Sequence, residues 1–172
     1  MVEEVSGLRA LAHPLRLRIL SLLTGTALSA AEVARELGVT HANASYHLRV
    51  LRAAGELVEA GEEKIRGGVA KRYRHPWEQA RDATGPGSVT DQDRVAYAGA
   101  LGDELRRRYS QRRAGTRSWL TDAETWVPPE TWYEVSALVQ RASELVHAEA
   151  RPPRTPGTVR VSMTSALFEM EP

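Results

Sequence analysis

The sequence predicts an α+β protein that is mainly helical, and three observations carry this prediction. Apolar residues recur at helical spacing through most of the 172 residues. Glycine-marked turns separate the helical segments from short stretches with the pattern of strands. A segment rich in Gly, Ser, Thr and Asp divides the chain. We therefore expect a first domain over residues 1–80, a linker over 81–90 and a second region over 91–172.

Composition limits the class of protein. Hydrophobic residues make up 42% and charged residues 26% of the chain, as in ordinary globular proteins. No apolar run approaches the roughly 20 residues of a membrane-spanning helix, and the N-terminus lacks a signal-peptide pattern. The sequence has no cysteine, which excludes disulfides and thiolate metal sites. We expect a cytoplasmic protein with no membrane contact.

Two helices are predicted before residue 24. Leucine and isoleucine recur there at helical spacing from Leu8 onward, and Pro14 interrupts the series. Proline is tolerated in the first turn of a helix but not in its interior. The sequence therefore predicts a short helix ending near Ala12 and a second helix from Pro14 to about Leu23.

A third, shorter helix and a turn follow. Ser29 and Glu32 have the spacing of a capping box, and Gly38 stands where a helix C-terminus favours a left-handed residue. Thr40, two residues later, suits the N-cap of the next helix. A short helix, a glycine-containing turn and a longer helix together predict a helix-turn-helix motif.

The helix after Thr40 has two different faces. Ala44, Leu48 and Leu51 form an apolar stripe, and Gly55 ends the helix. The polar and basic candidates for contacting DNA are Thr40, His41, Asn43, Ser45, Tyr46, His47, Arg49 and Arg52. Asparagine and serine reach base edges in a major groove, and arginine holds phosphates. An ordinary surface helix is also polar on one side, so this helix alone leaves both interpretations open.

A basic β-hairpin is predicted directly after this helix. Residues 57–60 and 69–74 are the candidate strands, with a turn at residues 67–68. The cations of the hairpin are Lys64, Arg66, Lys71, Arg72 and Arg74. A charged hairpin by itself is usually a solvated sheet edge. Placed after four helices in this order, however, it predicts the wing of a winged helix, which contacts phosphates or the minor groove.

Between residues 8 and 76 lie the segments LAHPLRLRILSLL, LSAAEVARELGVTHANASYHLRVLRAAGELVE and KRYRH. They resemble the DNA-binding domain of ArsR-type (ArsR/SmtB-like) winged-helix transcriptional regulators. The resemblance implies a homodimeric repressor or activator that binds a pseudo-palindromic operator in double-stranded DNA. Of the two, we expect a repressor. It implies that His41, Asn43, Ser45, Tyr46 and Arg49 face the groove. The cysteine pair and the dimer-helix histidines of the family's metal sensors have no counterpart here, so no metal or cofactor is expected.

The second region is predicted as two helices and two strands that serve dimerisation. A helix over about residues 91–113 carries an apolar stripe, and another helix begins at Pro128 and Pro129. The members of the stripe are Val95, Ala98, Leu101, Leu105 and Tyr109. Residues 117–127 look extended, and residues 158–170 alternate like a strand.

Four aromatic residues gather in this region, namely Trp119, Trp126, Trp132 and Tyr133. They are candidates for the wall of a small-molecule effector pocket. Core or dimer interface is the commoner role for such residues. Glu144 and His147 have the Glu-x-x-His spacing of carboxylate-bridged metal sites, but such sites need further ligands from other helices. We expect a solvated helix face there.

Three classes of function compete. An enzyme is not expected, because no phosphate loop, nucleophile elbow or metal-ligand cluster occurs. A winged helix used only for protein–protein contact predicts an apolar or acidic face, which Asn43, Ser45 and Arg49 do not provide. The preferred prediction is a sequence-specific DNA-binding regulator under possible control by a small molecule.

Overall fold

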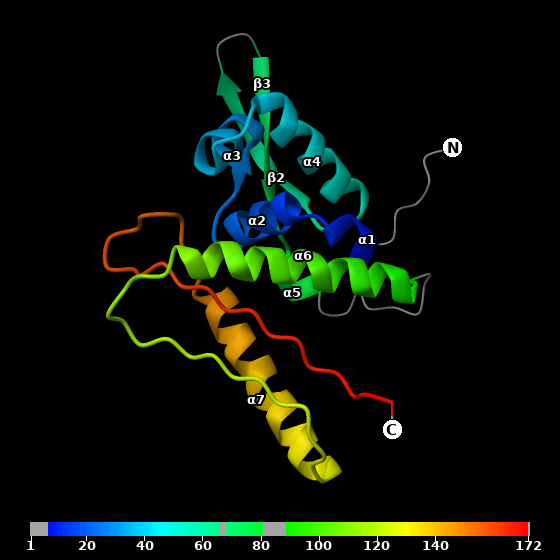
Figure 1. Cartoon of the computed structure of the whole chain (residues 1–172). Coiled ribbons are helices and arrows are strands. Elements are labelled where there is room, and N and C mark those ends of the chain that lie inside the picture. Colours follow the sequence, from blue (N-terminus) through cyan, green and yellow to red (C-terminus); the bar gives the residue numbers. More distant parts are fainter. Residues whose placement is uncertain (1–6, 66–67, 81–88, 172) are drawn as a thin grey trace.

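The computed structural model describes residues 7–65, 68–80 and 89–171 (Figure 1). Most of the linker predicted over residues 81–90 lies outside the described residues. The same holds for Arg66 and for Gly67 of the predicted hairpin turn.

Four helices form the N-terminal part of the fold. They are α1 (Gly7–Leu11), α2 (Pro14–Leu23), α3 (Ala30–Leu37) and α4 (His41–Ala53). The side chains that α2, α3, α4 and the following residues bury together are Leu15, Ile19, Leu20, Leu23, Val33, Ala34, Ala44, Leu48, Leu51 and Leu57. The helix boundaries confirm the prediction, and the predicted stripe of α4 is the part of that helix that enters the core.

Local capping explains why these helices begin and end where they do. The Ser29 hydroxyl accepts a hydrogen bond from the Glu32 N–H, and the Glu32 carboxylate accepts one from the N–H of Ser29. Gly38 takes φ +66°, a left-handed conformation that favours glycine and turns the chain toward α4. The Thr40 hydroxyl then accepts from the N–H of Asn43 at 3.2 Å. The capping box, the turn and the N-cap predicted from sequence are thus confirmed.

A three-stranded antiparallel sheet flanks these helices. Its strands are β1 (Leu28–Ser29), β2 (Val58–Ile65) and β3 (Gly68–Arg74), in the order β1-β3-β2. Strands β2 and β3 project as a hairpin beyond α4 in Figure 1. Strand β2 is longer than predicted because its polar half, although exposed, pairs with β3 as far as Ile65. Strand β1 has only two residues, too few for a sequence pattern.

Two long helices follow the short helix α5 (Trp77–Ala80). Helix α6 (Asp91–Ser110) runs across α1 and α2, and α7 (Pro129–Ala148) lies beyond it (Figure 1). Helix α6 starts at the predicted residue, where Thr90 and Asp93 form a capping box. The side of α6 that packs against the chain buries Ala100 and Glu104, whereas Val95 of the predicted stripe is 73% exposed. The stripe therefore points away from this chain's own core.

The predicted pair of strands in the second region is wrong for the single chain. Residues 117–128 and 151–171 contain no strand in the part that the structure describes. Alternating residues form a strand only when a neighbouring strand supplies hydrogen bonds, and within the described residues no strand pairs with these segments. Among the described residues, no helix is long and apolar enough to cross a membrane.

One short segment, residues 150–154, connects the end of α7 to the helix-turn-helix part; we call it the C-terminal strap. A Cβ atom placed on Gly25 would lie 2.8 Å from the backbone N and O of Arg151. Arg154 forms an ion pair with Glu36 of α3. The ring of His147 in α7 lies 5.4 Å from that of Trp77. The strap thus fixes the end of α7 against the N-terminal part.

Candidate nucleic-acid interface

The N-terminal half of α4 presents a polar, solvent-facing surface. His41, Asn43 and Tyr46 are exposed, and Ser45 is half-buried beside them. Burial of Ala44, Leu48 and Leu51 on the opposite side fixes the rotation of the helix about its axis. The core therefore directs the short polar side chains outward. The structure brings these predicted residues together on one helix face.

His47 is the exception, and its predicted place in the groove is wrong. Its side chain is only 6% exposed, and its ring centroid lies 4.7 Å from that of His13. The reason is helical geometry, because His47 follows Ala44 by three residues and therefore joins the buried stripe. His13 caps α2, where its Nδ1 accepts a hydrogen bond from the N–H of Leu15 at 3.1 Å.

Burial lowers the pKa of both rings. Desolvation is the main cause for each, and the positive charge of Arg16 adds to it. Burial also lowers the pKa of His75, whose Nδ1 lies 2.9 Å from the carbonyl oxygen of Glu56. All three histidines therefore favour their neutral form in the folded state.

The free energy of unfolding should consequently fall as the solution becomes mildly acidic. The unfolded chain binds protons at the ordinary histidine pKa of about 6.5, above the pKa values in the fold. The contribution of these histidines to the free energy of unfolding is then fully present above that pH and is lost progressively below it. We expect His13→Asn, which keeps an N-cap acceptor but cannot titrate, to reduce this dependence. Urea denaturation between about pH 8 and pH 5.5 measures both effects. Equal pH dependence in wild type and variant would contradict the account.

Several predicted DNA-contacting cations are already paired within the fold. Arg52 of α4 and Lys71 of β3 both contact the Glu59 carboxylate, at 2.8 and 3.1 Å. Arg49 donates only a long hydrogen bond of 3.4 Å to the carbonyl oxygen of Ser45. Lys64 has no ion-pair partner among the described residues. Of the predicted cations that the structure describes, Arg49 and Lys64 are therefore the most available to a phosphate.

Arg72 has a structural role that the sequence did not indicate. Its guanidinium donates to the carbonyl oxygen of Ala27 at 2.6 Å and pairs with Glu63 at 2.8 Å and Glu32 at 3.2 Å. These contacts tie β3 to β2, to the loop before β1 and to α3. Although burial opposes it, the hydrogen bonds from Ser29 together with Arg72 lower the pKa of Glu32. We therefore assign Arg72 to the fold rather than to the phosphate contacts of the wing.

Arg72→Ala should accordingly destabilise the protein by about 1–2 kcal/mol, because it removes a charged donor from a partly buried carbonyl. Lys64→Ala, on the same hairpin, is the matched control and should leave the free energy of unfolding unchanged. Denaturant melts of the two variants test the assignment. If Arg72→Ala unfolds with the same free energy as wild type, Arg72 is not needed for the fold and is available to contact phosphates from the wing.

One further exposed cation was missed by the sequence reasoning. Arg35 lies in the last turn of α3 and has no ion-pair partner among the residues described. The first helix of a helix-turn-helix crosses the DNA backbone, so a cation on α3 suits a phosphate. The sequence feature that could have identified Arg35 is its position on the side of α3 opposite the buried Val33.

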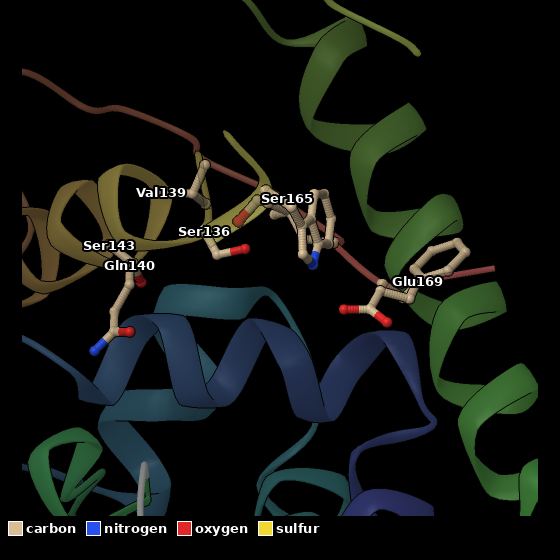
Figure 2. A pocket seen from close by; sticks show the side chains of 9 residues that line it. Ser136, Val139, Gln140, Ser143, Ser165 and Glu169 are labelled. Atoms are coloured by element: carbon tan, nitrogen blue, oxygen red, sulfur yellow. The ribbon is translucent and has the colours of Figure 1, made fainter. Parts of the chain in front are cut away.

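The four aromatic residues of the second half do not gather into one pocket. Trp119 and Trp126 are 83% and 87% exposed, and Tyr133 is exposed as well. Only Trp132 lines a groove, of about 560 Å³, between α7 and the C-terminal tail. Figure 2 shows the groove. Ser136 is among the α7 side chains that line it, and Glu169 is among those of the tail. The described residues hold no group of three or more metal-ligating side chains.

Residues 11–59 match a family model described as a helix-turn-helix domain. The match runs from the end of α1 into β2 and includes the whole of α3, the turn and α4. Fold and match together show a helix-turn-helix domain, which supports a role as a DNA-binding regulator. No curated protein matches the chain.

Proposed function

We propose that this protein is a sequence-specific, ArsR-type transcriptional repressor in the cytoplasm that acts by binding DNA and not by catalysis. The observation that carries the proposal is the exposed polar surface on the first half of α4. In a helix-turn-helix, this part of the second helix enters the major groove. Asn43 and Ser45 then read base edges, with Thr40, His41 and Tyr46 beside them.

Phosphate contacts come from cations around this surface. Arg49 lies one turn along α4, Arg35 lies on α3 and Lys64 lies on the hairpin. None of the three is paired with a carboxylate among the described residues. A winged helix used only for protein contact would not need free cations on three neighbouring elements. This arrangement favours DNA over the alternative of a protein-interaction module.

We further propose that a homodimer binds a pseudo-palindromic operator. One recognition helix reads few base pairs, and a two-fold dimer places two such helices about 34 Å apart on one face of DNA. The stripe of α6 supports a dimer, because Val95, Leu105 and Tyr109 are exposed while the opposite side packs against α1 and α2.

We also propose that a small-molecule effector controls operator binding. The groove beside Trp132 is the candidate site for a small molecule that contains both apolar and polar groups. A bound molecule would alter operator affinity only by the difference in its affinity for the two states of the protein.

The experiment that tests the function is a mobility shift on the DNA upstream of the protein's own gene, at several salt concentrations. Each phosphate contact contributes a slope of about −0.9 to log K against log salt. We expect a retarded complex that an excess of unrelated duplex does not displace and that weakens steeply with salt. Equal competition by unrelated duplex would contradict sequence-specific binding.

A further inference from the structure

Helix α7 is 20 residues long and buries no residue against the chain. Helices in globular proteins owe most of their stability to the packing of an apolar face. Leu138 is 63% exposed, and Val135, Leu145 and Val146 are exposed on the same side. We call these four residues the α7 strip.

The other sides of α7 are different. At 100° per residue, Trp132, Ser136 and Val139 share the side that lines the groove against the tail. Glu134, Ala137 and Arg141 share a polar side. The α7 strip lies between the two, and its side chains are 39–63% exposed. The exposed Val and Leu side chains of α7 are therefore confined to one side of the helix, whereas the exposed Tyr133 lies on another side.

The helix is nevertheless held in place. The C-terminal strap and the contact between His147 and Trp77 fix its C-terminal end to the helix-turn-helix part. The α7 strip is thus presented in a defined orientation relative to α4.

The segment before α7, residues 111–128, adds apolar surface; we call it the arm. Trp119 and Trp126 are almost fully exposed, and Leu120 is exposed between them. Since a large aromatic side chain buries about 150–250 Å², the two tryptophans alone hold roughly 300–500 Å² of uncovered surface. With the α7 strip added, the total approaches the roughly 800 Å² per partner of a standard interface.

We propose that the α7 strip and the arm form an interface with a second copy of this chain, with Trp119 and Trp126 of one copy covering α7 of the other. The area fits a stable dimer and exceeds the apolar patch of an ordinary monomer. Each copy has an exposed apolar strip on α7 and exposed tryptophans on the arm. Under a two-fold axis, the arm of each copy packs against the α7 strip of the other, so both surfaces are buried.

This interface is distinct from contacts along α6, and it deepens the proposed homodimer. Exposed tryptophans at its centre correspond to the residue type that most often dominates interface energetics. Because the strap fixes the end of α7, covering each α7 strip with the partner's arm would also set the separation of the two α4 helices.

The test is self-association of the full chain without DNA. Its result can therefore be interpreted even if the protein does not bind an operator. Leu138→Glu should raise the dissociation constant of the dimer about tenfold or more in sedimentation equilibrium, because a carboxylate would be buried without a partner. Ala137→Glu, on the polar side of the same helix, is the matched control and should dimerise like wild type.

Acrylamide quenching gives the second readout, which does not depend on a disruptive variant. We expect Trp119 and Trp126, followed through Trp→Phe variants, to be shielded in the dimer and to become quenchable on dilution. A dimer that is insensitive to Leu138→Glu and has quenchable tryptophans would show pairing through α6 alone and overturn the proposal. A chain that remains monomeric at micromolar concentration would overturn the proposal too.

Discussion

Replacing Asn43 with alanine should cost roughly 1–3 kcal/mol of discrimination between the operator and other sequences. The side chain is exposed on the first turn of α4, where it makes no contact that stabilises the fold; only its backbone N–H bonds to Thr40. We therefore expect specificity to fall while the melting temperature stays unchanged. Competition binding against single-base operator variants measures the loss. Retained discrimination at every position would remove Asn43 from the base-reading surface.

Two arginines on the same helix should separate phosphate binding from the internal ion pair. Arg49→Ala should weaken binding to all sequences and lower the salt slope by about one, because Arg49 is free to hold a phosphate. Arg52→Ala should have little effect on DNA, since Arg52 already pairs with Glu59. Equal losses for both variants would mean that the Glu59 pair opens when DNA binds.

Gly25→Ala should destabilise the protein by about 1–3 kcal/mol, the usual cost of overpacking. The added Cβ would lie within 3.0 Å of the backbone of Ala150 and Arg151, and backbone atoms cannot rotate away as a side chain can. The C-terminal strap would separate from the loop before β1, and its ion pair between Arg154 and Glu36 would weaken. Thermal melts and limited proteolysis after residue 148 should report the change together.

Gly99→Ala is the matched control for this prediction. Gly99 stands in the interior of α6, and a Cβ built on it would have no described atom within 4 Å apart from its own helix backbone and its chain neighbours. Alanine there should preserve stability or raise it by up to about 1 kcal/mol, because glycine is unfavourable inside a helix. If both variants melt like wild type, the close approach of the strap to Gly25 is not maintained in solution.

Local signals made the N-terminal part predictable from sequence. Pro14, the capping box at Ser29, Gly38 and Thr40 each specify a helix end through chemistry that depends only on near neighbours. The apolar period within each helix then determines which side is buried. These two kinds of signal suffice to place the helix-turn-helix and the exposed half of α4.

Contacts between distant residues were not predictable in the same way. The pairing of His47 with His13 and the attachment of Arg72 to Ala27 depend on how α4, α2 and β3 come together in space. A sequence pattern marks Arg72 only as a cation on a hairpin. It cannot show that nearby carboxylates will neutralise it.

The strand prediction for the second region failed for a further physical reason. Alternation over residues 158–170 indicates a strand, but a strand needs a partner for its backbone groups. The described chain provides none, so the segment stays irregular. The stripe of α6 was correctly located as a helix feature, but only the structure shows that α6 packs through its opposite side.

Selection of binding sites from a random duplex DNA library tests sequence-specific readout by α4 most directly. Wild-type protein should enrich an inverted repeat whose half-site centres lie about 10 base pairs apart, or a multiple of this spacing. The Asn43→Ala variant should enrich the same repeat with at least one position relaxed. Recovery of no common sequence by wild-type protein, although the DNA is retained in low salt, would contradict sequence-specific recognition by this helix.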